Sequence, residues 1–534
     1  MVLEHIMNIT VAITYRFTLV FLVHACISTS ILRAYETAPN VVILYADDLG
    51  YGDVQSYNQD HGRIATPHID RLATQGMRFT DGHSSSGVCS PSRYTILTGR
   101  YHWRTRLQSG IVGLWGSPLI KPDRVTIASL AKEQGYATAC IGKWHLGWNW
   151  PIAETQKQFF KTTGYNGKKD LEATDQHRAA WKQAFSKPIS GGPTAVGFDE
   201  YFGTDVPNWP PYCFIENDRT VGIPSEFAAP NLFIKNQASQ QGPALPGWTL
   251  EPILPALGDR ACDFIKRQAK SASPFLLYLP LTSPHTPLSV NDEWRGKSNL
   301  NLYADFVMET DSIVGQVLAA LEQNKIDKKT LIIFTSDNGC APYIGVDQLE
   351  KKGHFPSGDL RGYKADAWEG GHRVPFIVRW DGVTKPGSIC NQLVHQSDLL
   401  ATLSEVMQAH LPDNAGEDSV SFLPLLKGSN SPVRENSVSC SIRGIPSIRK
   451  NHWKYIPVPS SGGWGKGGDQ SQPHQLYNLE NDIGETQNLA STHPAVVEEL
   501  QQLLETLIRR GRSTPGPNQH NDVVVRRHPV QPAK

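Results

Sequence analysis

The sequence predicts an α/β protein with a large, mostly parallel sheet sandwiched by helices and a smaller C-terminal α+β domain. Short continuous apolar runs alternate with helix-like segments from Val41 onward, a pattern typical of strands buried on both faces of a parallel sheet. The chain has 534 residues, more than the roughly 250–300 that one hydrophobic core can hold. After about Gly428 the alternation changes to short β-like runs and one amphipathic helix, which indicates a second domain.

The predicted elements follow from apolar periodicity, helix caps and turn residues. Strands of the main sheet are expected at 41–45, 136–141, 275–279, 331–335 and 376–378, and helices near 67–76, 126–134, 254–268, 302–322 and 398–407. The stretch 148–252 has few periodic segments, so we interpret it as long loops over one end of the sheet. The small domain should contain strands at 437–442, 453–456 and 475–477 and a helix at 494–509. The predicted division is a signal peptide (1–34), a catalytic domain (35–427), an α+β subdomain (428–512) and a flexible tail (513–534).

The overall charge argues against a protein that coats polyanions. Lys+Arg and Asp+Glu are both 51, so the formal net charge is zero. There is then no global field to attract nucleic acid or an anionic membrane, and we expect no nucleic-acid partner. Any anion must be recognised by a local site, which favours an enzyme with a pocket.

The N-terminus resembles an export signal. Arg16 precedes the apolar run 17–27, and small residues follow at 28–30. The run is too short to span a membrane, so we expect no stable membrane span, and a lipid on Cys26 is a minor alternative. Asn8 is the only N-glycosylation acceptor and lies inside the signal. We therefore expect an exported protein, periplasmic or secreted, and bacterial rather than lysosomal.

One cysteine lies in an unusual context. Beyond the signal seven cysteines remain, without metal-thiolate spacing, and an odd number leaves at least one unpaired. Cys89 begins the segment Cys-Ser-Pro-Ser-Arg, in which Ser90 could cap a helix that Pro91 begins and Gly99 ends. A helix N-terminus lowers a thiol pKa, and Arg93 would lie one turn on. On these two residues alone, a buried cysteine beside a surface arginine is the favoured interpretation, because cysteines are so often buried.

The wider pattern resembles the type I sulfatases, which have an alkaline-phosphatase-like fold. The resemblance rests on Cys89-x-Pro-x-Arg93 with the following Thr-Gly-Arg100, and it extends from about Asn40 to Asn488. It implies that a maturation enzyme converts Cys89 to formylglycine, whose hydrate is the nucleophile. It also implies one calcium ion, with ligands at Asp47, Asp48, Asp337, Asn338 and the residue derived from Cys89. An all-oxygen set suits a hard cation, and calcium fits better than magnesium, which keeps more of its water.

The resemblance also assigns the anion-binding and proton-transfer groups. Lys143 and His145, in Gly-Lys-Trp-His-Leu-Gly, match the sulfate-binding lysine and the histidine beside the nucleophile. His285 and Lys364 match the pair at the leaving-group side, and either could be the general acid. Each segment alone is more often an ordinary turn or surface feature. Independently, sulfate-ester cleavage needs fixed positive charge, and three clustered aspartates call for a counter-charge, here a cation.

The predicted function is hydrolysis of sulfate monoesters, on a sulfated carbohydrate, with small aryl sulfates as surrogates. One alternative is a phosphonate or phosphate monoester hydrolase of the same fold, which a two-zinc site would favour. The other is a sulfated-glycan-binding protein without turnover, which an unmodified Cys89 would favour. Five tryptophans in segments expected near the pocket could stack on a sugar or aryl face: Trp103, Trp115, Trp148, Trp150 and Trp209.

Overall fold

The protein is built around one ten-stranded sheet. The computed structural model describes residues 38–162, 170–233 and 239–528, so the expected signal peptide lies outside the described residues. The strand order is β13-β2-β12-β11-β1-β10-β4-β5-β6-β7. The strands are β1 (Asn40–Ala46), β2 (Met77–Phe79), β4 (Ala137–Lys143), β5 (Glu200–Thr204), β6 (Ile215–Glu216), β7 (Arg219–Thr220), β10 (Phe275–Pro280), β11 (Thr330–Ser336), β12 (Phe376–Arg379) and β13 (Ser388–Cys390).

The centre of this sheet is parallel and its flanks are mixed. β1 pairs in parallel with β10 and β11, and β4 joins β10 and β5 in parallel. β12 was predicted from its apolar run and is antiparallel to β11. The connection between them stays at the sheet edge where β11 ends, so β12 starts there and runs back in the opposite direction. The predicted α/β class with a large, mostly parallel sheet is therefore confirmed, with β2 and β12 as antiparallel neighbours.

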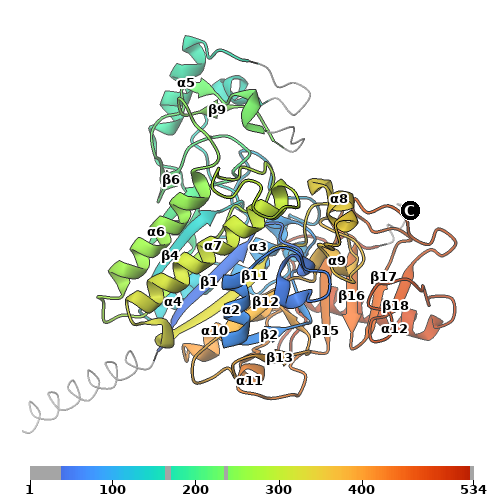
Figure 1. Cartoon of the computed structure of the whole chain (residues 1–534). Coiled ribbons are helices and arrows are strands. Elements are labelled where there is room, and N and C mark those ends of the chain that lie inside the picture. The colour runs from blue at the N-terminus through green and yellow to red at the C-terminus, as the bar shows by residue number, and fades with distance from the viewer. Residues whose placement is uncertain (1–37, 163–169, 234–238, 529–534) are drawn as a thin grey trace, which may run out of the picture.

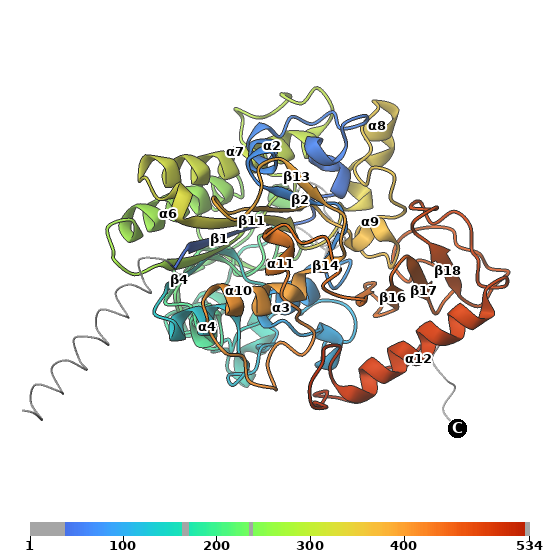
Figure 2. The same cartoon turned by 90° about the horizontal axis from the view of Figure 1, so that it is seen from below.

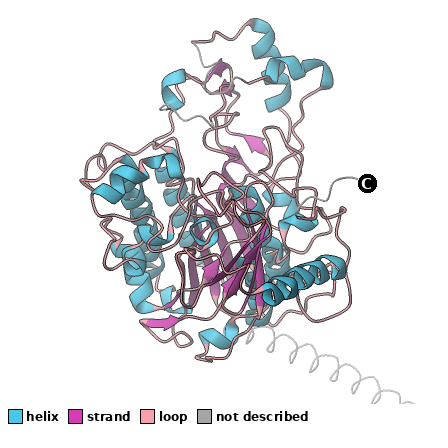
Figure 3. Cartoon of the chain, turned by 90° about the vertical axis from the view of Figure 1, so that its right-hand side faces the viewer, coloured by secondary structure: helices cyan, strands magenta, loops and turns pink. Residues whose placement is uncertain are grey.

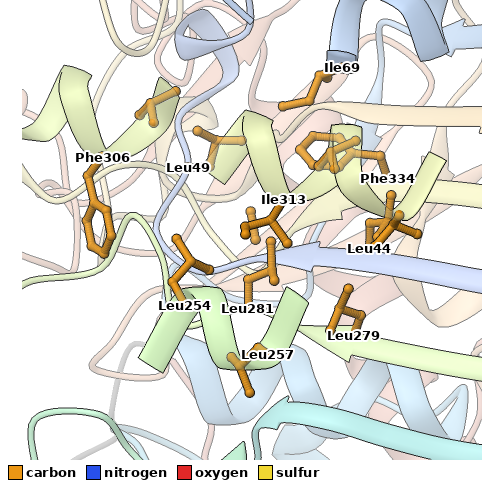
Figure 4. Close-up of a cluster of buried hydrophobic side chains, with 14 of the residues drawn as sticks. Leu44, Leu49, Ile69, Leu254, Leu257, Leu279, Leu281, Phe306, Ile313 and Phe334 are labelled. Carbon is orange, nitrogen blue, oxygen red and sulfur yellow. The ribbon is translucent and has the colours of Figure 1, made fainter. Parts of the chain in front are cut away.

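Helices cover both faces of the sheet (Figures 2 and 3). Successive side chains of a strand point to opposite faces, and both sets are apolar here. Val42 and Leu44 of β1 lie in the core under α2, α6 and α7 (Figure 4). Ile43 and Tyr45 lie in the opposite core with α3, α4 and α10. The helices are α2 (Pro67–Gln75), α3 (Cys89–Thr98), α4 (Ile127–Glu133), α6 (Ile253–Gln268), α7 (Leu302–Gln323), α8 (Val346–Lys351), α9 (Glu369–His372), α10 (Leu399–Val406) and α11 (Leu423–Leu426).

The stretch 148–252 contains more regular structure than the predicted loops. It contributes β5 to the main sheet and forms helix α5 (Asp175–Phe185) in a lobe that projects above the sheet in Figure 1, with the short strands β8 (Glu226–Phe227) and β9 (Pro243–Ala244). Aromatic side chains hold α5: Trp181 is buried and its indole N–H donates to the Phe159 carbonyl. The prediction of long loops missed β5 because this strand has only five residues, one of them a glycine, and shows no clear apolar pattern.

The smaller C-terminal domain has an antiparallel four-stranded sheet and one long helix. Its strands pair in the order β15 (Asn436–Cys440), β16 (Pro446–Lys450), β17 (Trp453–Ile456) and β18 (Gln475–Asn478), and α12 (Pro494–Arg510) packs beside them. β16 was not predicted. Leu500 and Leu504 share a core with Tyr101 and Trp103 of the large domain, so hydrophobic packing joins the two domains.

Residues 513–528, for which the sequence predicts a flexible tail, contact the body of the protein. Thr514 is buried, and the Asp522 N–H donates to the Arg104 carbonyl at 2.7 Å. In the part of the chain that the structure describes, no helix is both long enough and apolar enough to cross a membrane.

Candidate active site

The predicted site residues gather at the carboxyl ends of the central strands. Asp47 and Asp48 follow β1, Asp337 and Asn338 follow β11, and Lys143 ends β4. Parallel neighbours end at the same sheet edge, where α/β proteins bind ligands. All ten predicted site residues are buried, with exposed fractions from 0 to 7%. The structure therefore brings together every residue that the sequence analysis assigned to the site.

Cys89 is the first residue of α3, which differs from the predicted start at Pro91. Val88 is the N-cap, and Ser90 accepts a hydrogen bond from the Val112 N–H instead of capping the helix. Gly99 ends the helix at φ 61°, as predicted. Burial raises the pKa of Cys89 to about 12, although Lys143 and Lys364 lower it. The expected lowering by the helix N-terminus is therefore overcome by desolvation, and the thiol is neutral at pH 7.

Arg93 lies one turn into α3 and joins the two aspartate-bearing strand ends. Its Nη2 and Nε donate to Asp337 Oδ2 at 2.8 and 3.1 Å, and Nη2 lies 3.3 Å from Asp47 Oδ1. Nη1 donates to the Lys143 carbonyl at 3.1 Å. A guanidinium with fixed donors suits such bridging, so Arg93 holds the acidic strand ends in place.

Two lysines complete the ionic pairing. Lys143 Nζ lies 2.7 Å from Asp47 Oδ2, and Lys364 Nζ lies 2.5 Å from Asp48 Oδ2. With Arg93 on Asp337, each of the three carboxylates contacts a cation of the chain. Charge balance alone therefore does not demand a metal, contrary to the argument from the acidic residues in the sequence.

Unsatisfied buried oxygens give a better test of a metal site. Asn338 Oδ1 is buried and accepts no hydrogen bond from the described residues, and Asp47 Oδ1 has only its ionic contact with Arg93 at 3.3 Å. Such buried oxygens are costly unless another group binds them. Ligand atoms of Asp47, Asp48, Cys89 and His285 all lie within 4.8 Å of one another. Asp337 lies outside that group, and its oxygens accept from Arg93 and from the Asp48 N–H at 3.1 Å. A carboxylate has further lone pairs, so these hydrogen bonds still allow Asp337 to bind a cation. The residues present therefore fit a hard cation bound between β1 and β11.

Burial shapes the protonation of the surrounding groups. Two effects raise the pKa of Asp337 to about 7: desolvation is the larger, and repulsion from the Asp47 carboxylate is the next. Desolvation and the Lys364 ammonium lower the pKa of His285 to about 4. His285 Nδ1 lies 2.5 Å from the Thr286 carbonyl, which can only accept, so we assign the proton of neutral His285 to Nδ1. Its Nε2 then faces Asp48 Oδ2, 3.6 Å away.

His145 offers an unused ring nitrogen. Its Nε2 donates to the Val112 carbonyl at 3.2 Å, while Nδ1 is buried without a partner among the described residues. Burial and the nearby Lys143 lower its pKa, so the ring is neutral. The backbone at His145 is left-handed (φ 53°) and its N–H donates to Asp205 Oδ1 at 3.2 Å. Asp205 was not predicted, although it directly follows β5 in the same way that Asp47 directly follows β1.

The five tryptophans divide by location. Trp103 stacks on Tyr101 inside the interdomain core, so it is a packing residue. The Trp209 ring lies edge-on to His145, with 5.5 Å between centroids. The other three, Trp115, Trp148 and Trp150, line a cavity of about 530 Å³ beside α5.

Comparison with known proteins identifies the family. The family model described as Sulfatase matches residues 39–409. The chain belongs to the sulfatase family. It is therefore a sulfuric ester hydrolase, in agreement with the resemblance inferred from Cys89 and its neighbours. The seven cysteines of the described chain, Cys89 among them, are free thiols in the structure.

Relatives of this sulfatase include both carbohydrate and steroid enzymes. The N-acetylgalactosamine-6-O-sulfatase of Bacteroides thetaiotaomicron is 33% identical and aligns with 88% of this chain and 93% of its own. The steryl-sulfatase of Rattus norvegicus is 32% identical over 73% of this chain and 70% of its own. A solved structure from work on glycosaminoglycan metabolism by Bacteroides thetaiotaomicron has a TM-score of 0.72 at 30% identity, covering 88% of this chain and 99% of that one.

Proposed function

We propose that this sulfatase hydrolyses a sulfate monoester of a carbohydrate, with a formylglycine derived from Cys89 and one bound calcium ion. The observation that carries the proposal is the position of Cys89: its Sγ lies among ligand atoms of Asp47, Asp48 and His285, with Lys143 and Lys364 close enough to affect its pKa. A nucleophile, an anion-binding pair and a cation site thus meet at one point.

The neutral thiol of Cys89 supports the need for conversion. With a pKa of about 12 the thiol carries almost no thiolate at pH 7, and the thiolate is the reactive form. Formylglycine, produced by an oxidising maturation enzyme, supplies a hydrated aldehyde with one hydroxyl for attack on sulfur and a second through which sulfate can be expelled. His145 Nδ1, a buried acceptor without a partner among the described residues, can take the proton of that second hydroxyl.

Positive charge holds the sulfate in this proposal. Lys143 pairs with Asp47, and Lys364 pairs with Asp48. Burial lowers the pKa of Lys364, but the charges of Asp48 and of the other acidic groups around it together raise that pKa well above its usual value, so Lys364 keeps its proton. A calcium ion bound by Asp47, Asp48, Asp337 and Asn338 would add positive charge at the same place. Fixed charges of this kind favour the transition state because they need no reorganisation.

The leaving oxygen requires a proton, for which His285 and Lys364 are the candidates. Neutral His285 holds its proton on Nδ1 and presents Nε2 toward the site. Binding of an anionic ester beside Nε2 favours the imidazolium, which could then donate to the leaving oxygen. We assign the general acid to His285, with Lys364 as the alternative.

A carbohydrate substrate is supported by the relatives. Beside the Bacteroides enzyme named for N-acetylgalactosamine 6-sulfate, a crystal structure of Ps i-CgsB in complex with k-i-k-neocarrahexaose has a TM-score of 0.63 at 25% identity, over 88% of this chain and 92% of that one. We further propose that the protein is exported after removal of residues 1–34. The phosphonate hydrolase remains the second candidate on fold alone.

Mass spectrometry of the tryptic peptide from Phe79 to Arg93 tests the proposal. Protein produced with a maturation enzyme should carry an aldehyde in place of the thiol and should hydrolyse sugar sulfates. Fully active protein with an unmodified thiol would exclude the formylglycine. Faster turnover of phosphonate monoesters than of any sulfate ester would favour the second candidate.

A further inference from the structure

Two exposed aromatic side chains lie against each other although they belong to different domains. Tyr343 is 50% exposed and Trp464 is 42% exposed, and in the described chain they are the only aromatics among the exposed large hydrophobic residues. Their ring centroids are 5.9 Å apart, at an interplanar angle of 47°. Exposed aromatic surface of this kind marks binding sites more often than packing.

Tyr343 lies on a segment that contacts the proposed active site. It lies in the 3-10 turn Pro342–Ile344, five residues after Asn338, and the Lys364 N–H donates to the Cys340 carbonyl in the same segment at 2.9 Å. Burial raises the pKa of Tyr343, and the charges of Lys364 and Asp48 also act on it. Tyr343 is thus half exposed beside the backbone segment that contacts Lys364.

Trp464 is held at the same place by a glycine-rich loop of the small domain. The Ala367 N–H donates to the Ser461 carbonyl at 2.8 Å, and the Gly465 N–H donates to Asp366 Oδ1 at 2.7 Å. A Cβ on Gly463 would lie only 2.2 Å from the Ala365 carbonyl oxygen, so only glycine permits this approach. The loop therefore sits on the residues that directly follow Lys364.

We propose that Tyr343 and Trp464 form an aromatic platform that binds the face of the sugar ring whose sulfate lies at Lys364. The inference rests on the proposed function and adds the position of the sugar. A sugar presents apolar C–H groups on its ring face, and aromatic side chains offer a rigid apolar surface beside a polar site. The small domain thereby contributes to substrate choice, although the proposed catalytic groups all come from the large domain.

The platform can be tested by binding to protein that cannot turn over substrate. In Cys89→Ser protein, calorimetry compares inorganic sulfate with N-acetylgalactosamine 6-sulfate and a sulfated galactan oligosaccharide. At least one sugar sulfate should bind more tightly than inorganic sulfate. Adding Trp464→Ala or Tyr343→Ala should weaken the binding of that sugar sulfate roughly 3- to 10-fold. The affinity for inorganic sulfate should stay within about twofold.

Two further variants separate stacking from a general surface effect. Trp464→Phe keeps an aromatic ring and should retain most of the sugar affinity, whereas Ile389→Ala, 59% exposed on edge strand β13, should change nothing. The platform is overturned if no sugar sulfate binds more tightly than inorganic sulfate. It is also overturned if both alanine variants bind the sugar sulfate with unchanged affinity. The proposed function fails separately, when matured wild-type protein hydrolyses neither sugar nor aryl sulfates.

Discussion

The protein contains two buried charge clusters of similar composition and different completeness. The catalytic cluster pairs Asp47, Asp48 and Asp337 with Lys143, Lys364 and Arg93. The interface cluster, between the large and small domains, pairs Asp81, Glu369 and Glu485 with Arg449, Arg373 and Lys454. Each also contains histidines with metal-ligand spacing: His285 in the first, His83 and His372 in the second.

The difference lies in what remains unpaired. In the catalytic cluster Asn338 Oδ1 and His145 Nδ1 are buried without a partner among the described residues. In the interface cluster His83 bonds Asp81 and His372, and Lys454 bridges Glu369 and Glu485 at 2.9 Å each. Glu485 Oε1 accepts no hydrogen bond of good geometry there, but the Lys454 ammonium lies beside it. A cluster whose groups bind each other stabilises a domain contact, whereas one that leaves polar atoms unsatisfied is ready for a ligand.

The largest effect should come from Cys89→Ala, which separates activity from stability in the catalytic cluster. Loss of the nucleophile should lower sulfate-ester turnover by at least about 10³-fold, while thermal unfolding changes little because Cys89 carries no structural charge. Cys262→Ala, in α6, is the matched control and should keep activity. Full activity in Cys89→Ala would refute the assignment of the nucleophile.

His285→Ala tests the general acid. Turnover of a sugar sulfate should fall by roughly 10²–10⁴-fold, the usual contribution of general acid catalysis. A nitrophenyl sulfate should lose less, because its leaving group needs the proton less. Steady-state kinetics on both substrates measure the ratio, and an equal loss on both would make His285 an anion-binding group instead.

Lys454→Ala tests the interface cluster. This variant leaves Glu369 and Glu485 buried without the cation that they share. The free energy of unfolding, measured by chemical denaturation, should therefore fall by about 3–5 kcal/mol. Lys450, on the same sheet as Lys454, forms a surface pair with Glu499 of α12. The control Lys450→Ala removes this pair and should lower the free energy of unfolding by less than about 1 kcal/mol. Similar losses for both would mean that the buried pairing contributes little.

Asn338→Ala tests the metal assignment. Loss of one oxygen ligand should weaken calcium binding at least about 10- to 100-fold, measured by metal analysis after dialysis against graded calcium. His83→Gln, in the interface cluster, should leave the bound calcium unchanged. Two tightly bound zinc ions in the wild-type protein would instead support a phosphatase-like site.

The smallest expected effect is a pH dependence from the interface cluster. Desolvation raises the pKa of Glu485 to about 7, against about 4.3 in an unfolded chain. The stability from holding this proton is present below the unfolded pKa and is lost as the pH rises to about 7. From pH 5 to pH 8 the free energy of unfolding of the wild type should fall by on the order of 2 kcal/mol more than that of Glu485→Gln. Parallel pH curves for the two proteins would contradict this assignment.

Sequence patterns were sufficient for the central elements and for the residue types of the site. β1, β10 and β11 were predicted from apolar runs, because strands buried on both faces need no alternation. β2, β5, β13 and β16 were missed, since three to five residues carry little pattern. The site residues were found through the order of short motifs around Cys89, not through any one motif.

The sequence by itself determined which groups this protein can use: a cysteine before a proline and an arginine, aspartates after strands, and a change of pattern at the small domain. Only the tertiary structure decided how those groups behave. Burial makes the Cys89 thiol neutral, Lys364 reaches Asp48 from a distant segment, and the Trp464 loop lies against Tyr343. Local periodicity reflects propensities of neighbouring residues, whereas desolvation and contacts between distant segments arise only when the whole chain packs.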